Sequence, residues 1–329
     1  MLHAIIRYGD GSVSTDPSPD AIRRGLNDKD AILWVALDQP TDDELKVLDE
    51  QFHFHALTLE DVREKSKSPK IEPYDGEDGR DNYTFIVFFG PDCGKAAEHV
   101  KSAEVNFFLS PRYLVTVHRE KVKPIVDLAA RVKKDPAKML SRGTDVLLYE
   151  VLDGIVDEYT GILDSMQGRI DQLEDRATNH PVPGVLKQIS IAKRDLLGLR
   201  RVMAPQREII AKLARGEVET VRESVRVYLR DVQDHLTRDV ETLEIYRDLI
   251  LGARDIYLSS ISNQLNQIMK TLTVITVIAL PFTIITSFFG MNFEAIPGLH
   301  TKQGFWIACS AMLGTVIVLL FLFKRRRWI

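Results

Sequence analysis

The stretch TLTVITVIALPFTIITSFFGMN, residues 271–292, contains no Asp, Glu, Lys, Arg or His. A second run without these residues covers positions 303–323. Each run is close to the length of about twenty residues that a helix needs to cross about 30 Å of hydrocarbon. We therefore predict two transmembrane helices, at residues 266–290 and 304–323, joined by an extracytoplasmic loop at residues 291–303.

Basic residues cluster after the second run. The tail at residues 324–329 has four consecutive basic side chains, Lys324, Arg325, Arg326 and Arg327. The loop between the two runs has only three ionisable residues, Glu294, His300 and Lys302. Because positive charge accumulates on the cytoplasmic side of membrane proteins, both termini are predicted to be cytoplasmic. The first residues, MLHAIIRYGDG, lack a basic leader and a long apolar run, so no signal peptide is expected.

The overall composition excludes several classes of function. Of the 329 residues 27% are charged, and the net charge of −4 does not indicate a nucleic-acid partner. The sequence has no Walker loop, no nucleophile elbow and no Cys/His zinc spacing, so neither an enzyme nor an organic cofactor is expected. Cys93 and Cys309 are far apart and indicate no disulfide framework.

The first part of the chain alternates short β-rich runs with helical ones. We predict strands at AIIRY, AILWVAL, YTFIVFF, EVNFFLS and RYLVTVH, and a helix at DDELKVLDEQF. The segment SKSPKIEPYDGEDGRDN, residues 66–82, is rich in turn formers and is interpreted as a surface loop. This order predicts a compact α/β domain at residues 1–143.

The pattern becomes helical from residue 144 to residue 265. Apolar residues recur every three or four positions between Leu147 and Leu173, which predicts one long helix. NHPVPG breaks it, and a second helix returns beside the first as an antiparallel hairpin. Between Gly216 and Pro281 only Gly252 interrupts good helix formers, which predicts a helix of about 60 residues, about 90 Å long.

Two helices cannot enclose an aqueous path, so either the spans only anchor the chain or several copies assemble. One face of the first span carries amides, hydroxyls and apolar residues at helical spacing: Asn266, Met269, Leu272, Thr273, Thr276, Leu280, Thr283 and Ser287. Around a shared axis these residues would line a pore with oxygen ligands and hydrophobic collars. Alternatively, the hydroxyls pack helices together or bond to the preceding turn.

Several segments resemble the CorA family of divalent-cation channels. They are the block IMKTLTVITVIALPFTIITSFFGMNFEAIPGL, the ending KRRRWI, VYLRDVQDHL at residues 227–236, DIYLSSISNQLNQIMK and HALTLEDV. The resemblance implies a funnel-shaped homopentamer in the plasma (inner) membrane, with the α/β domains around long first-span helices. It also implies passive inward transport of Mg²⁺, and of Co²⁺ and Ni²⁺.

The resemblance places the pore mouth at Gly290, Met291, Asn292 and Glu294. Mg²⁺ sheds its water reluctantly, and a ring of Asn292 amide oxygens would touch its hydration shell. Gly290 is expected to let the helix end in a backbone conformation that other residues avoid. The alternative interpretation is that Gly-Met-Asn is a plain helix cap and turn. A membrane-anchored helical scaffold or signalling protein is the corresponding alternative for the whole chain.

The transported ion has two candidates. Gly298 follows the loop proline where most family members have an acidic residue, and the IPG loop and RRVMAPQRE resemble the zinc-transporting ZntB branch. The intact Gly-Met-Asn triplet favours Mg²⁺. Because neither span contains a carboxylate, no proton relay is expected and the membrane potential would drive influx.

The resemblance also implies inhibition by cytoplasmic Mg²⁺ bound between neighbouring subunits. The matching carboxylates are Glu60, Asp61 and Asp231, with Asp153, Asp157 and Asp234 as further candidates. Asp153 and Asp157 are four residues apart and Asp231 and Asp234 are three apart, spacings that share a helix face. The alternative is that these acids are solvated surface. His53 and His55 are assigned no role.

Overall fold

The computed structural model describes residues 1–66, 68–76, 81–92, 101–291, 302–326 and 328. The chain forms two compact units. The first contains Met1–Arg176 and Val182–Ala253, and the second contains Ala177–Pro181 and Arg254–Ile329. The α/β part of the chain therefore belongs to the first unit, and both uncharged runs belong to the second.

A seven-stranded sheet forms the centre of the first unit, in the order β2-β1-β3-β7-β6-β5-β4. Its strands are β1 (Leu2–Arg7), β2 (Val13–Ser14), β3 (Ile32–Asp38), β4 (Lys70–Tyr74), β5 (Tyr83–Pro91), β6 (Ser102–Leu109) and β7 (Tyr113–His118). Only β3 and β7 pair in parallel, with Val35 opposite Val115. Every residue of β5 is buried, so this strand is covered on both faces.

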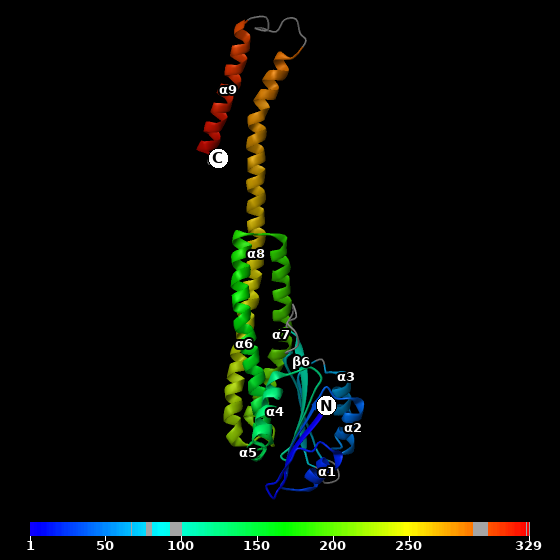
Figure 1. Ribbon diagram of the computed structural model, residues 1–329. Coiled ribbons are helices and arrows are strands. Elements are labelled where there is room, and N and C mark those ends of the chain that lie inside the picture. Colours follow the sequence, from blue (N-terminus) through cyan, green and yellow to red (C-terminus); the bar gives the residue numbers. More distant parts are fainter. Residues whose placement is uncertain (67, 77–80, 93–100, 292–301, 327, 329) are drawn as a thin grey trace. The chain divides into compact units, whose positions relative to one another are not determined.

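Helices cover both faces of the sheet (Figure 1). One face carries α1 (Pro19–Asn27), α2 (Asp42–Glu50) and α3 (Ala56–Glu64), and the other carries α4 (Lys123–Lys134), α6 (Thr144–Asn179) and α7 (Pro183–Arg215). The short α5 (Pro136–Ser141) precedes α6. Local sequence starts these helices: the Ser18 side chain caps α1, and Thr41 and Glu44 form a capping box at α2.

The structure confirms the five predicted strands and the helix in DDELKVLDEQF, and it corrects one interpretation. Residues 66–82 are not only a surface loop, because β4 lies within them and pairs with β5. Pro73 is compatible with this strand because β4 is at the edge of the sheet, where a missing N–H leaves no ladder bond unmade. The sequence patterns did not predict α1, α4 and α5.

The predicted antiparallel hairpin is confirmed as α6 and α7, which lie side by side against the sheet (Figure 1). Each helix anchors to the same backbone carbonyl of β5. The Tyr159 hydroxyl of α6 donates to Phe89 O at 2.9 Å, and Gln206 Nε2 of α7 donates to it at 2.7 Å. Both lone pairs of one buried carbonyl are thereby used, which fixes the hairpin on the sheet.

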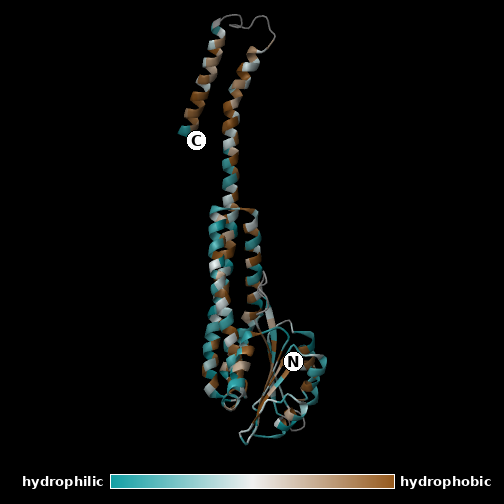
Figure 2. Cartoon of the chain, in the orientation of Figure 1, coloured by the Kyte–Doolittle hydropathy of each residue, from teal (hydrophilic) through white to brown (hydrophobic). Residues whose placement is uncertain are grey.

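The long predicted helix is present as α8 (Glu223–Phe289), which has 67 residues and continues through Pro281. Gly216 does not belong to it: with φ of 78° this glycine ends α7. α9 (Lys302–Arg325) follows. By length and composition both α8 and α9 could cross a membrane, and only 6% and 0% of their apolar windows are buried. Figure 2 shows these windows as hydrophobic runs in α9 and in the C-terminal part of α8.

Candidate ion pathway and regulatory carboxylates

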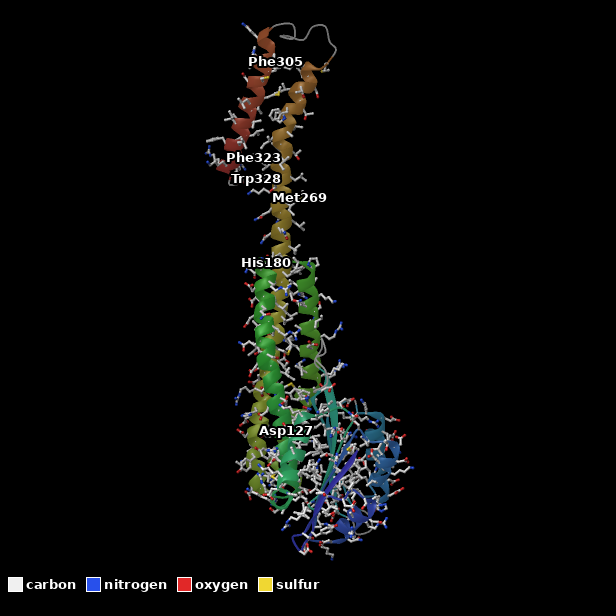
Figure 3. The ribbon with its side chains drawn as sticks, in the orientation of Figure 1. Asp127, His180, Met269, Phe305, Phe323 and Trp328 are labelled. Atoms are coloured by element: carbon white, nitrogen blue, oxygen red, sulfur yellow. The ribbon has the colours of Figure 1, made fainter. Side chains whose placement is uncertain are left out.

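The residues predicted to line a pore are exposed in the second unit. This holds for all eight, Asn266, Met269, Leu272, Thr273, Thr276, Leu280, Thr283 and Ser287. Met269, which is labelled in Figure 3, projects from α8 with 60% of its surface exposed. One chain therefore leaves this face of α8 uncovered, available to other copies or to lipid.

The threonine hydroxyls on this face share a common bonding pattern. Each donates its proton to the carbonyl four residues earlier: Thr273 to Met269 O and Thr276 to Leu272 O at 2.8 Å, and Thr283 to Ala279 O at 3.3 Å. A hydroxyl has one proton and two lone pairs, so outward-facing acceptor capacity is left over. The alternative in which the hydroxyls bond to the preceding turn is therefore observed for these three threonines. It accounts for the protons of the hydroxyls and leaves their oxygens able to accept further hydrogen bonds. The face itself presents hydrogen-bond acceptors.

The outer end of α8 differs from expectation at Gly290. This glycine lacks the positive φ that characterises Gly11, Gly143 and Gly216, so the predicted left-handed conformation is wrong. Its N–H instead donates to Thr286 O at 3.0 Å, and an added Cβ would lie 3.1 Å from the same oxygen. Close approach to the last helical turn therefore favours glycine here. Met291 is 46% exposed, and Asn292 and Glu294 lie outside the described residues.

Carboxylates of α6 and α8 come together in the first unit. Burial, and next the neighbouring charge of Asp157, raise the pKa of Asp153, and Asp231 of α8 contributes in the same direction. The Tyr149 hydroxyl, 3.5 Å from Asp153 Oδ2, and the nearby His235 oppose this rise. The structure thus brings three predicted residues, Asp153, Asp157 and Asp231, into one negative region. Asp234 is exposed.

Two residues of this region were missed from the sequence. His235 Nε2 lies 3.9 Å from Asp231 Oδ1, one helical turn along α8. Asp239, one turn further, is 6% exposed, accepts a hydrogen bond from Thr160 Oγ1 at 2.8 Å, and has its pKa raised by burial. The four-residue spacing of Asp231, His235 and Asp239 was the available signal, because it puts them on one helix face.

Glu60 and Asp61 lie on α3, away from any other predicted ligand in one chain. Glu60 is exposed. Asp61 is already paired: its Oδ2 lies 2.5 Å from Lys70 Nζ, and the same ammonium lies 3.2 Å from Glu72 Oε2. Lys70 and Glu72 belong to β4, the strand interpreted from sequence as a loop. Strand alternation, which places residues two apart on one face, would have grouped them.

One chain does not assemble a complete metal site from these acids. Within the residues that the structure describes, no group of three or more His, Cys, Asp or Glu side chains could hold a metal ion. Asp61 and Asp231 therefore do not belong to one such group within the described part of the chain. His55 serves as the N-cap of α3, where its Nδ1 accepts from Leu57 N at 3.2 Å.

The α/β domain is followed by the long helix α8 and by α9, and both helices carry apolar segments that by length and composition could cross a membrane. The chain belongs to the family described as CorA-like Mg²⁺ transporter protein, which it matches over residues 29–325. The resemblance noted in the sequence is thereby confirmed.

Three relatives illustrate the range of this similarity. The chain is 32% identical over 281 residues to the cobalt/magnesium transport protein CorA of Thermotoga maritima, covering 85% of this chain and 78% of that protein. It is 24% identical over 323 residues to the zinc transport protein ZntB of Yersinia enterocolitica, covering 98% and 94%. The complete structure of the CorA magnesium transporter from Methanocaldococcus jannaschii matches with a TM-score of 0.81 and 24% identity, covering 99% and 98%, which supports the fold.

Proposed function

We propose that the chain forms a homopentameric channel in the plasma (inner) membrane that carries Mg²⁺, and also Co²⁺ and Ni²⁺, into the cell. Membership of the CorA-like family and the cobalt/magnesium relative support divalent-cation transport. The observation that carries the proposal is the exposed hydroxyl face of α8. In this proposal residues 1–143 and 144–265 form the cytoplasmic part, and both termini are cytoplasmic.

The hydroxyl face suits a hydrated cation. Water molecules bound to a cation point their protons outward, and they would donate to the threonine oxygens whose own protons are held by the helix. Mg²⁺ keeps several of its waters when it binds protein oxygen. Rings of acceptors at Thr273, Thr276 and Thr283, with Asn292 at the mouth, would therefore guide the ion with its water shell. Glu294 would attract cations to the outer opening.

The membrane potential supplies the driving force. It is worth roughly 2.3 kcal/mol per charge per 100 mV, hence about 4.6 kcal/mol for a divalent ion. The uncharged runs contain no carboxylate that could couple transport to protons. Influx therefore needs no second energy source.

Cytoplasmic Mg²⁺ would close the channel by binding Glu60, Asp61, Asp231, Asp153, Asp157 and Asp234. Carboxylate oxygens are the donors that Mg²⁺ prefers, so these residues fit the ion. Burial, and after it repulsion from Asp157, raises the pKa of Asp153, and a bound cation would relieve the repulsion. Because one chain offers no complete site in its described part, the ion would bridge neighbouring copies and hold them together.

Zinc transport is the second candidate. The similarity to ZntB extends over 98% of the chain, and Gly298 replaces the usual loop acid. The Gly-Met-Asn triplet and the family description favour Mg²⁺.

Uptake into liposomes distinguishes these functions. The purified full-length protein is reconstituted, an inside-negative potential is imposed, and uptake of Mg²⁺, Co²⁺, Ni²⁺ and Zn²⁺ is measured. We expect Mg²⁺ uptake in the wild type, and a loss of at least about tenfold in Asn292→Ala because several hydrogen bonds to the hydrated ion disappear together. Asn263→Ala, an exposed amide of α8 without an assigned role, is the control.

Each other outcome selects an alternative. Faster uptake of Zn²⁺ than of Mg²⁺ assigns the chain to the zinc branch. Equal uptake by the wild type and Asn292→Ala contradicts the pore, and no uptake by either supports the membrane-anchored scaffold.

A further inference from the structure

Lys70 of β4 lies beside Asp61 of α3 and forms an ion pair with it. Its Nζ lies 2.5 Å from Asp61 Oδ2 and 3.2 Å from Glu72 Oε2, so one ammonium bridges two carboxylates. The Tyr74 hydroxyl donates to the same Glu72 oxygen at 3.0 Å. Lys70 also lies over the ring of Phe85, 5.4 Å from its centroid. The carboxylate of Asp61 is therefore neutralised within its own chain.

The fold produces this arrangement from two elements. Residues two apart in a strand point to one face, so β4 presents Lys70, Glu72 and Tyr74 together. Lys70 pairs opposite Val87 of β5, near the edge of the sheet. α3 covers this face of the sheet (Figure 1) and supplies Asp61. Asp61 and Lys70 are each 29% exposed, so solvent and ions can reach the pair.

The ammonium is a permanent competitor at neutral pH. Partial burial opposes the charged form, but hydrogen bonds to Asp61 and Glu72 outweigh it and raise the pKa of Lys70. Because Lys70 belongs to the same chain as Asp61, the fraction of Asp61 paired with the ammonium does not depend on protein concentration. A divalent ion that binds Asp61 must displace the ammonium or bind against its charge.

We propose that Lys70 is the resident counter-ion of Asp61 and lowers the affinity of this carboxylate for the regulatory divalent cation. The inference rests on the proposed function, in which Asp61 takes part in inhibition by cytoplasmic Mg²⁺. Lys70 thereby sets the concentration at which the sensor fills. It keeps the channel open until Mg²⁺ is abundant enough to compete, and Glu72 holds the displaced ammonium.

The test is a Mg²⁺ titration of the full-length protein in detergent, followed by melting temperature and by protection from protease. Lys70→Met keeps the aliphatic stem and removes the charge. We expect its titration midpoint to fall about fivefold, the ratio that a partly exposed ion pair of ordinary strength provides. Lys70→Arg should keep the wild-type midpoint. Lys46→Met is the matched control, because it breaks the exposed Lys46–Asp43 pair of 2.6 Å on α2.

Inhibition of liposome uptake by internal Mg²⁺ should shift by the same factor. If Lys70→Met does not fold, Lys70→Gln is titrated in its place. An unchanged midpoint in Lys70→Met, alongside a loss of response in Asp61→Asn, overturns the role of Lys70 and leaves the sensor in place. An unchanged response in Asp61→Asn overturns the sensor role of Asp61 itself, and the inference with it. A shift of the Mg²⁺ titration midpoint of equal size in Lys46→Met would also overturn the inference, because the loss of any lysine charge would then produce the effect.

Discussion

α8 has two halves that differ in how their side chains are covered. In residues 223–253, within the first unit, apolar side chains are buried at helical intervals, among them Leu229, Leu236 and Leu243. In residues 254–289, within the second unit, equally large side chains such as Leu272 and Leu280 are more than half exposed. Apolar side chains at helical spacing are therefore covered by the rest of the chain in the first half and remain exposed in the second.

The polar side chains follow the same division. In the first half they bond across helices: Asp239 accepts from Thr160, and the Tyr246 hydroxyl lies 3.4 Å from Gln167 Oε1. In the second half the hydroxyls of Thr273, Thr276 and Thr283 donate to the backbone of their own helix. The first half is stabilised by packing within one chain. The second half lacks such packing, and its apolar side chains are free to contact lipid or other copies.

The largest expected effect is on a buried leucine of the first half. Leu236 is fully buried, so Leu236→Ala should cost about 2–5 kcal/mol of stability through lost burial and a cavity. Leu272→Ala, in the second half, removes a side chain that is 56% exposed and should change stability by less than about 0.5 kcal/mol. Thermal unfolding of the detergent-solubilised protein, followed by circular dichroism, measures both. Equal losses would show that the second half is packed as tightly as the first.

A smaller effect is expected from the threonines. Thr160→Val leaves the buried Asp239 without its donor, which should cost about 1–3 kcal/mol. Thr276→Val removes a hydroxyl that is exposed and donates to Leu272 O of its own helix, so protomer stability should change by less than about 0.5 kcal/mol. The melting temperatures of the two variants test the contrast. If Thr276→Val destabilises more than Thr160→Val, the hydroxyl of α8 has a partner outside its own helix, and its assignment to a water-filled face is wrong.

Sequence periodicity was sufficient for the elements whose apolar residues repeat regularly. The stripe from Leu147 to Leu173 predicted α6, and five β-rich runs predicted five strands of the sheet. β4 was missed because Pro73 and its charged neighbours look like a turn, and only pairing with β5 makes them a strand. α1, α4 and α5 each begin with a proline in the first turn, which looks like a loop residue in sequence although it is favoured at the start of a helix.

The candidate sites were predictable to different degrees for a physical reason. Helical spacing decides which side chains share a face, so the hydroxyl stripe of α8 could be defined from sequence alone. Exposure does not single this stripe out, because residues 262–269 are all exposed, and its role in lining a pore stays a prediction. Contacts between elements distant in the chain could not. The ion pair of Asp61 with Lys70 depends on α3 packing over β4. Burial and Asp157 of the same helix raise the pKa of Asp153 most, and only the further contribution of Asp231 depends on α6 lying beside α8. No local pattern encodes either juxtaposition.

The smallest effect concerns the carboxylates of the first half and depends on pH. The pKa of Asp153 is raised above its ordinary value of 3.8, first by burial and then by Asp157, so ionisation costs more in the folded than in the unfolded chain. Its contribution to stability is complete below pH 3.8 and is lost as the pH rises through the raised pKa. Asp153→Asn should therefore stabilise the protein at pH 7, by up to about 1 kcal/mol after allowance for its partial exposure. This gain in stability should vanish below pH 3.8, where Asp153 is protonated in both the folded and the unfolded chain.

Melting temperatures of Asp153→Asn and of the wild type, measured from pH 3.5 to pH 8 without divalent ions, test this. Asp248→Asn, which replaces an exposed carboxylate paired with its neighbour Arg247 on α8, is the control for the loss of one acidic charge. Mg²⁺ sharpens the comparison, because an ion bound near Asp153 removes the same repulsion and should shrink the advantage of the variant. If Asp153→Asn raises the melting temperature equally at all pH values, the effect comes from packing. Charge repulsion at Asp153 would then not be the interaction that a cytoplasmic cation relieves.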